Sequence, residues 1–470
     1  MGFTEKTFLF IFLPLSIIFY IASDKIFRST KANNVTLSIL SLGFLLWAEK
    51  RSFFVFAIVV LLTFISGKLL YKDKQRKLIA LPVVLLVGIL IFFKYAEYVV
   101  LHLGFSKLQN MSLLEDIIVP IGLSFIIFEA LSYVIDCYRG DTEPGSLLDC
   151  ITFLSLFPKL TAGPIILWKD FKPQLTDRKM CSDDTAAGID RIIVGYAKKA
   201  IVADTFGFQI ALINEGIASG GVDQATMWLR AILYFFQLYF DFAGYSDIAI
   251  GLCKIFGFEI KDNFNYPYLS KSVSEFWRRW HISLGTWFRE YVYIPLGGSR
   301  SGNVYLNLTI VFILTGIWHG AGLPFLLWGV SNAFFVVVER YVQQKSWYKE
   351  IPDIVKWFIT VTVICLMWVM FVSADTLQIL QTYAAMFGLG DTEELTFTWQ
   401  YYLSNRTILL LVVIVCGHLF EIKTINKKIK TILNTRSGRI IKRTGLLMLF
   451  VVDILFVVNS TYSPFIYFRF

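Results

Sequence analysis

His319 is the residue of this 470-residue chain whose type and surroundings point most directly to chemistry. It lies inside an apolar stretch, 305–341, and glycines and Pro324 flank it in GIWHGAGLP (316–324). An ionisable side chain is expensive in hydrocarbon and rarely persists there without a partner or a hydrated cavity. The flanking residues predict a backbone break beside the imidazole, a setting that suits proton transfer. From this stretch alone, a packing histidine bonded to a neighbour is an equally weighted alternative.

A second histidine, His281, lies in segment 263–300, which is too polar to span a membrane but rich in Trp, Phe and Tyr. Aromatic residues and arginines of this kind are typical of the membrane interface. Four residues recur at helical spacing and are predicted to share one face of a helix: Trp277, Trp280, His281 and Leu284.

Three arginines accompany this histidine: Arg278, Arg279 and Arg289. Guanidinium groups could attract a phosphate or an anionic carrier at the cytoplasmic side. Anchoring to anionic lipid head groups is the favoured alternative when the arginines are taken alone. We expect Arg278 and Arg279 to depress the pKa of His281, which would then act as an uncharged donor or acceptor.

A third polar feature is a stripe inside the apolar segment 226–256. Its members recur at steps of three and four, which places them on one helical face: Arg230, Tyr234, Gln237, Asp241 and Tyr245. Asp247 follows two residues later. Either aspartate could orient a histidine, as a carboxylate does in a triad, and the cluster could line a substrate path. A structural network of charges that locks neighbouring helices together has about equal weight.

The elements that must position these residues are membrane helices. The chain is 56% hydrophobic and only 17% charged, with a mean hydropathy of +0.62, which indicates an all-α, polytopic membrane protein. By the length rule we expect about ten to twelve spans, together with re-entrant or interfacial helices. We predict one membrane domain over 1–470, with N-terminal spans in 1–115, a motif-bearing core in 116–345 and C-terminal spans in 346–470.

The net charge of +9 is concentrated in two loops, at Lys68–Lys77 and Lys423–Arg443. The positive-inside rule places both loops, and segment 137–185, in the cytoplasm, with both chain ends outside. Basic juxtamembrane loops are topology signals first, so we expect no nucleic-acid partner. The first apolar run is expected to be a span and not a cleaved signal. The six cysteines lack metal-binding spacing, and His102 and His418, without motif support, are expected to be structural.

Several motifs in one order resemble the membrane-bound O-acyltransferases, and most closely the alginate O-acetyltransferase branch. The strongest are FWRRWHISL around His281, then WFREYVYIPLGG, then IWHG at 317–320. Supporting stretches run from about residue 120 onward: PIGLSFIIFEALSYVIDCYRG (120–140), FPKLTAGPI (157–165), DFAGYSDIAIG (241–251), NFNYPY (263–268) and SPFIYFRF (463–470). The N-terminal hundred residues match only in hydropathy.

The resemblance implies an acyltransferase of the bacterial plasma membrane with His319 as the catalytic residue and His281 as the second family histidine. It implies a cytoplasmic thioester donor, acetyl-CoA or an acyl carrier, with no tightly bound cofactor and no metal. The acetyl group would reach a hydroxyl of an extracellular polysaccharide, commonly through a partner acetyltransferase outside the membrane. We expect the binding residues to include Trp280, Trp318, Arg278, Arg279, Asp241, Tyr245, Asp247 and Asn265, with membrane lipid around the protein.

A direct transfer is the simplest scheme, because the chain offers no G-x-S-x-G elbow for a serine acyl-enzyme. His319 would then be the general base. The related D-alanyl branch ranks second, because its segment corresponding to IPLGGSR (294–300) is usually shorter and ends differently. A transporter or flippase with a proton relay and a scaffold for polysaccharide export are further alternatives.

Overall fold

The computed structural model describes residues 2–73, 76–102, 119–219, 221–389, 397–420, 431–433 and 435–459, and Phe465. Within these residues every regular element is helical, which confirms the all-α prediction. Parts of the two basic loops (74–75 and 421–430), the side chains of His102 and His418, and the rest of the tail motif 463–470 lie outside the described residues.

The helices follow the apolar runs of the sequence closely. Their bounds, with short helical turns marked η, are η1 Phe8–Phe12, α1 Leu13–Phe27, α2 Thr30–Ala48, α3 Lys50–Lys72, α4 Arg76–His102, α7 Leu123–Arg139, α8 Leu147–Ser155, α9 Trp168–Phe171, η2 Lys172–Leu175, α10 Ser182–Tyr196, η3 Ala197–Ala203, α11 Asp204–Ala218, α12 Gln224–Ile255, η4 Pro267–Leu269, α13 Val273–Arg279, α14 Ile282–Phe288, η5 Arg289–Tyr293, α15 Val304–His319, α16 Leu323–Val342, α17 Ser346–Glu350, α18 Asp353–Val372, α19 Thr376–Met386, α20 Trp399–Tyr402, α21 Asn405–Phe420 and α23 Arg436–Asn459.

Five of the described helical segments are long and apolar enough to cross a membrane. They are Phe8–Phe27, Lys50–Lys72, Leu78–Ala96, Leu323–Val342 and Asp353–Val372. α15 and the apolar part of α21 are shorter. The figure of ten to twelve spans stays a prediction, because other apolar runs form helices that are shorter or carry more polar residues. The polytopic character is confirmed.

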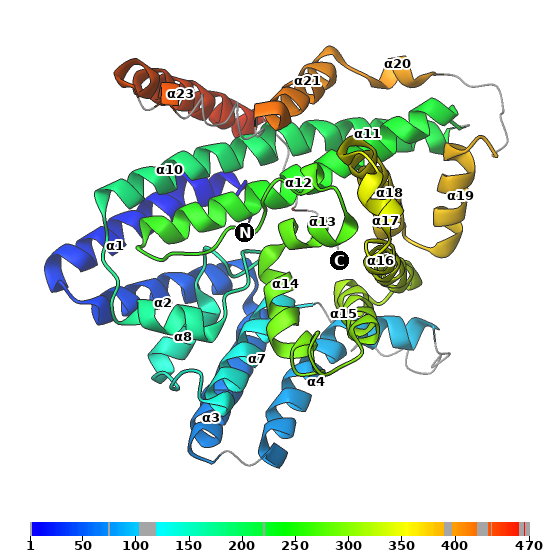
Figure 1. The fold of residues 1–470 in the computed structure, drawn as a ribbon. Helices are drawn as coiled ribbons and strands as arrows, with labels where there is room; N and C mark the ends of the chain where they lie inside the picture. Colours follow the sequence, from blue (N-terminus) through cyan, green and yellow to red (C-terminus); the bar gives the residue numbers. More distant parts are fainter. Residues whose placement is uncertain are drawn as a thin grey trace.

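Helices α10 and α12 cross the middle of the molecule side by side and hold its other parts in place (Figure 1). Their backbones touch through two glycine pairs, Gly188 with Gly251 and Gly195 with Gly244. A Cβ built on any of the four would lie 2.6–2.8 Å from the carbonyl oxygen of its partner glycine. Close glycine contacts of this kind are a common packing device between membrane helices. They bring Asp241 and Asp247 of α12 close to α10 and η3.

A second close crossing joins α15 and α16, the two helices that follow one another around His319 (Figure 1). A Cβ at Gly316 would lie 2.5 Å from the carbonyl oxygen of Phe325, and a Cβ at Gly329 would lie 2.7 Å from that of Phe312. Any larger residue would push the helices apart. The glycines therefore fix how the C-terminal end of α15 faces its neighbours.

Helix α7 secures the buried loop 156–167 and the helices that follow His281. Ser132 Oγ accepts from the backbone N–H of Trp168 (3.1 Å), and Trp287 Nε1 donates to the carbonyl oxygen of Phe128 (2.7 Å). Glu129 forms a buried ion pair with Lys159 from that loop. Because these contacts satisfy polar groups inside the protein, the loop can lie buried beside the histidines.

Candidate active site

His281 and His319 line the same cavity, of about 80 Å³, inside the protein. Both side chains are buried, at 2% and 5% exposure. The other walls come from α13 to α16 and α18, and they are mostly aromatic or apolar: Trp277, Trp280, Leu284, Gly285, Phe288, Val311, Phe312, Thr315, Trp328 and Trp368. The structure thus brings together two histidines that are 38 positions apart in the sequence.

His319 is the last residue of α15, and the predicted break in the backbone follows it. Gly320 is extended, and α16 begins at Leu323 with Pro324 in its first turn. The imidazole is packed edge-to-face against the rings of Trp328 (centroids 5.1 Å apart) and Phe371 (5.0 Å). These contacts hold the ring while the helix end leaves it beside the cavity.

Two residues of α4 bind the carbonyl groups at the end of α15. Lys94 Nζ donates to the carbonyl oxygen of Trp318, and Tyr95 Oη donates to those of Ile317 and Gly320. Helix ends leave carbonyl groups without intrahelical partners, and in an apolar setting each needs another donor. We call Lys94 and Tyr95 the α4 clamp, because they tie the helix end that carries His319 to a neighbouring helix.

His281 lies in a sharp corner between α13 and α14. Its φ is +46°, a left-handed conformation that is unusual for a residue with a side chain. The corner is held by a short backbone pairing, because Ile282 N donates to the oxygen of Asn263 (2.9 Å) and Asn265 N donates to that of Arg279 (2.9 Å). Trp277, Trp280, His281 and Leu284 line one cavity, but the prediction that they share one face of a single helix is wrong, because this corner separates α13 from α14.

The side-chain partner of His281 is Asn263, which is 1% exposed. His281 Nδ1 lies 3.2 Å from Asn263 Oδ1, and the same oxygen accepts from the backbone N–H (3.1 Å) and hydroxyl (2.9 Å) of Ser283. Asn263 Nδ2 donates in turn to Ser246 Oγ on α12 (3.2 Å). A buried amide, and not a carboxylate, therefore orients this histidine.

Burial alone lowers the pKa of His281, to about 3, so the imidazole is neutral at ordinary pH. The expected neutral state is present, but the expected cause is wrong. Arg279 pairs with Glu275 (2.5 Å), and Arg278 is exposed. Neither side chain lines the histidine cavity, so the structure does not bring the two arginines to the histidines.

The aspartates of α12 are occupied elsewhere. Asp241 pairs with Lys199 of η3 (2.6 Å), while Asp247 pairs with Arg191 of α10 (2.8 Å) and Lys198 of η3 (2.6 Å). These contacts form the interhelical network of charges that was one of the two alternatives from sequence. The idea that an aspartate orients a histidine is not supported, since neither lines the histidine cavity.

The remaining predicted binding residues are spread over different places. Trp280 lies in the cavity wall, whereas Trp318 packs behind it against the rings of Phe125 (5.8 Å) and Phe128 (5.3 Å).

The other two predicted binding residues lie away from the histidine cavity. Tyr245 is hydrogen-bonded to Thr161. Asn265 lines a separate polar cavity of about 190 Å³ that also includes Asp247, Asn263 and Arg191.

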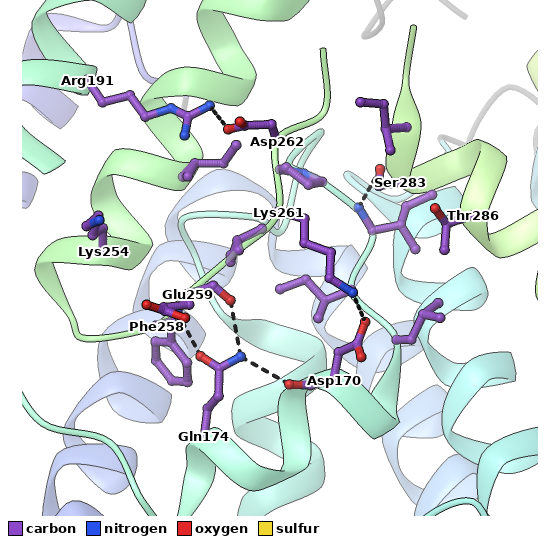
Figure 2. Close-up of a pocket in the computed structure, with 17 residues that line it drawn as sticks. Asp170, Gln174, Arg191, Lys254, Phe258, Glu259, Lys261, Asp262, Ser283 and Thr286 are labelled. Carbon is purple, nitrogen blue, oxygen red and sulfur yellow. Dashed lines mark hydrogen bonds and ion pairs between the residues drawn. The ribbon is translucent and has the colours of Figure 1, made fainter. Parts of the chain in front are cut away.

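A larger cavity, about 430 Å³, lies on the other side of the His281 corner. Its lining combines apolar and charged residues, and Figure 2 shows Lys261 paired with Asp170 (3.0 Å) and Arg191 paired with Asp262 (2.5 Å). Ser283 and Thr286 form its wall towards α14. Because Ser283 also touches Asn263 and lies 3.4 Å from His281 Nδ1, a single layer of residues separates this groove from His281. We call it the α9–α14 groove.

Sequence reasoning missed Asn263, Ser283, Trp328 and the α4 clamp. Asn263 stands in the NFNYPY motif, two positions before Asn265, which was predicted as a binding residue. Only the register of the backbone pairing shows which of the two asparagines contacts His281. Lys94 could have been identified from the sequence, because it is a charged residue at the end of the apolar run 78–94.

Comparisons with known proteins identify the family of the chain. Residues 52–380 match the model of the membrane-bound O-acyltransferase family. The chain is 35% identical to a probable alginate O-acetylase AlgI from Pseudomonas putida over the whole of both chains. It is 28% identical to a peptidoglycan O-acetyltransferase from Helicobacter pylori over 100% of this chain and 97% of that one. A teichoic acid D-alanyltransferase from Streptococcus thermophilus is 25% identical over 54% of this chain and 66% of that one. The protein therefore belongs to the membrane-bound O-acyltransferase family and is an O-acyltransferase of the membrane.

Proposed function

We propose that this protein transfers an acetyl group from a cytoplasmic thioester toward a hydroxyl of an extracellular polysaccharide, with His281 and His319 at the reacting atoms. The observation that carries the proposal is that two buried histidines share one cavity. The names of the relatives, which include alginate and peptidoglycan O-acetyltransferases, support acetyl as the group and an envelope polymer as its destination.

The transfer needs a base and leaves a thiol. In the scheme we propose, His319 takes the proton of the acceptor hydroxyl while its oxygen attacks the thioester carbonyl carbon. The C–S bond of the tetrahedral intermediate then breaks, and the protonated His319 returns the proton to the leaving thiolate. No net proton is released, so a histidine inside a closed cavity is sufficient. General-base help of this kind contributes about 10²–10⁴-fold.

The cavity also offers hydrogen-bond donors for the developing oxyanion. Trp277 Nε1 already donates to Asn332 Oδ1 (3.0 Å). Trp328 Nε1 is buried and has no acceptor among the residues described by the structure. A buried N–H left without a partner is unfavourable by about 1–3 kcal/mol, so an acyl oxygen bound next to His319 would gain a donor. Trp328 is therefore the donor that we assign to the acyl carbonyl.

The α9–α14 groove suits the arm of a thioester donor. Its apolar residues can pack against a pantetheine chain, and Arg191, Lys254 and Lys261, which also line it (Figure 2), can attract phosphate groups. The positive-inside rule places segment 137–185, which supplies one wall, in the cytoplasm. Acetyl-CoA or an acyl carrier protein would enter here. The product leaves on the opposite side, where a partner acetyltransferase would complete transfer to the polymer.

The test is the amount of base-releasable acetate on cell-surface glycans in the native strain and in one carrying His319→Ala, at membrane levels shown equal by immunoblot. We expect the variant to lose this acetate. Unchanged acetate would overturn acetyl transfer by His319. D-alanine measured in the same hydrolysates addresses the second candidate, which the D-alanyltransferase relative supports: its loss, with acetate retained, would favour that group instead.

A further inference from the structure

The contacts of Asn263 define which of its two terminal atoms is the oxygen. The backbone N–H of Ser283 points at Oδ1 (3.1 Å), and a backbone N–H can only donate. The atom facing it must therefore accept, which excludes the flipped amide. The other end, Nδ2, donates to Ser246 Oγ (3.2 Å). Both ends of the amide are thus fixed by groups outside the histidine.

The fixed oxygen decides the protonation of His281. An amide oxygen only accepts, so His281 Nδ1 at 3.2 Å must carry a hydrogen, because two lone pairs at that distance would repel. The hydroxyl of Ser283 does not compete, since it lies closer to Asn263 Oδ1 (2.9 Å) than to His281 Nδ1 (3.4 Å). Its single hydrogen is donated to Asn263 Oδ1, and one of its two lone pairs accepts from Ile165 N–H (3.1 Å).

We propose that Asn263 is a positioning residue that holds neutral His281 in the Nδ1–H tautomer, so that Nε2 is a hydrogen-bond acceptor in the histidine cavity. Its consequence for catalysis rests on the proposed function: a hydroxyl of the acceptor next to the one that His319 deprotonates can donate to His281 Nε2, which directs the acceptor toward the thioester. In the Nε2–H tautomer, Nε2 would be a hydrogen-bond donor and could not accept the hydrogen of that hydroxyl. In serine proteases the wrong tautomer lowers kcat about 10⁴-fold.

Asn263 also explains why the corner between α13 and α14 keeps its unusual backbone. Its main-chain oxygen binds Ile282 N (2.9 Å) while its side chain binds Ser283 and His281, on either side of that residue. One buried residue thus fixes both the left-handed φ of His281 and the orientation of its ring. Positioning through a partner of the reacting group is a recurring device in histidine sites.

The direct test is the ¹⁵N spectrum of the full-length protein in detergent micelles, labelled at histidine nitrogens. Protonated and bare imidazole nitrogens have well-separated shifts, and two-bond couplings identify each nitrogen. The His281 signals are assigned by their loss in His281→Gln. We expect a neutral ring with hydrogen on Nδ1. A wild-type ring with hydrogen on Nε2 would overturn the proposal, whatever the substrates of the protein are.

Two substitutions separate positioning from folding. Asn263→Leu keeps the number and branching of the side-chain heavy atoms but removes the acceptor, so the Ser283 hydroxyl can donate to Nδ1 and move the hydrogen to Nε2. Asn263→Asp keeps the acceptor and the Nδ1–H tautomer. We expect the initial rate of surface acetylation, at equal protein level, to fall roughly 10²–10⁴-fold in Asn263→Leu and much less in Asn263→Asp.

Asn33→Leu is the matched control. It removes another buried asparagine, Asn33 of α2, which binds Asp24 of α1 (2.7 Å). This change should leave the tautomer of His281 and the acetylation rate unchanged. Equal rates in Asn263→Leu and wild type would refute positioning, as would equal losses in both Asn263 variants with an unchanged tautomer. A correct tautomer together with acetate that is insensitive to His319→Ala would instead refute the proposed function and leave the assignment of Asn263 standing.

Discussion

Two regions of this molecule bury ionisable groups, and they use them in opposite ways. On α12, Asp241 and Asp247 meet Lys199, Lys198 and Arg191 at 2.6–2.8 Å, and the charges neutralise one another between helices. Around the histidine cavity, two imidazoles line a mostly aromatic space, and no carboxylate is among its lining residues. The first region joins α12 to α10 and η3, and the second presents lone pairs to a small cavity.

The difference shows that a polar residue in an apolar helix does not by itself mark a reaction site. Buried charges are stable only when they are paired, so a charged residue in an apolar helix can be explained by its partner on a neighbouring helix. A neutral histidine can be buried without a counter-charge. We therefore expect substitutions in the histidine cavity to change the rate, and substitutions on α12 to change stability.

The largest effect is expected for His281→Gln. Glutamine keeps a polar side chain of similar length but lacks the Nε2 lone pair that Asn263 directs into the cavity. We expect the initial rate of surface acetylation to fall about 10²–10⁴-fold, with membrane levels unchanged by immunoblot. A rate within a factor of two of wild type would show that His281 does not take part in the reaction. His319 would then be the only histidine of the cavity with a proposed role in it.

A smaller rate effect is expected for Lys94→Met, which removes half of the α4 clamp. The carbonyl oxygen of Trp318 then loses its donor, and the end of α15 shifts with His319. Because misplacement by about 1 Å can lower a rate about 10²-fold, we expect a loss of about 10–10²-fold. Lys68→Met, on the exposed face of α3, is the control and should retain the wild-type rate. A full rate in Lys94→Met would show that the clamp is dispensable.

Asp241→Asn tests the other side of the comparison. Lys199 would keep Asp204 (2.8 Å) as a partner, so the loss of unfolding free energy should stay below the about 3–5 kcal/mol of a fully broken buried pair. Thermal unfolding in detergent should shift down, while the acetylation rate per folded molecule stays at the wild-type value. If the specific rate falls with an unchanged melting temperature, the stripe on α12 is part of the reaction path after all.

The smallest effect concerns pH. Burial lowers the pKa of His281 to about 3, below the about 6.5 of an unfolded histidine. Between these values only the unfolded chain binds the proton, so stability falls as pH is lowered through this window. At pH 5 the difference is about 2 kcal/mol. The melting temperature should therefore fall from pH 7 to pH 5, and by less in His281→Gln. An equal fall in both proteins would contradict a buried, neutral His281.

Much of the fold was predictable because hydropathy and helix breakers act locally. The apolar runs became helices, and the glycines around His319 predicted where α15 ends. The single helical face predicted for Trp277, Trp280, His281 and Leu284 is wrong, because the chain turns a corner at His281. That corner was not predictable, because a left-handed residue other than glycine depends on the pairing of 263–265 with 279–282. That pairing, and the reach of Lys94 over more than 200 positions to Trp318, are tertiary contacts that no local pattern encodes.

The central claim is that His281 and His319 act as one site, and a double-mutant cycle tests it most directly. Initial rates of surface acetylation are compared for wild type, His281→Gln, His319→Gln and the double variant, at equal membrane levels. Residues that act as a unit are strongly non-additive. We predict that the double variant is no slower than the slower single variant by more than about threefold. A double variant as slow as the product of the two single losses, or a single variant with the wild-type rate, would contradict the account.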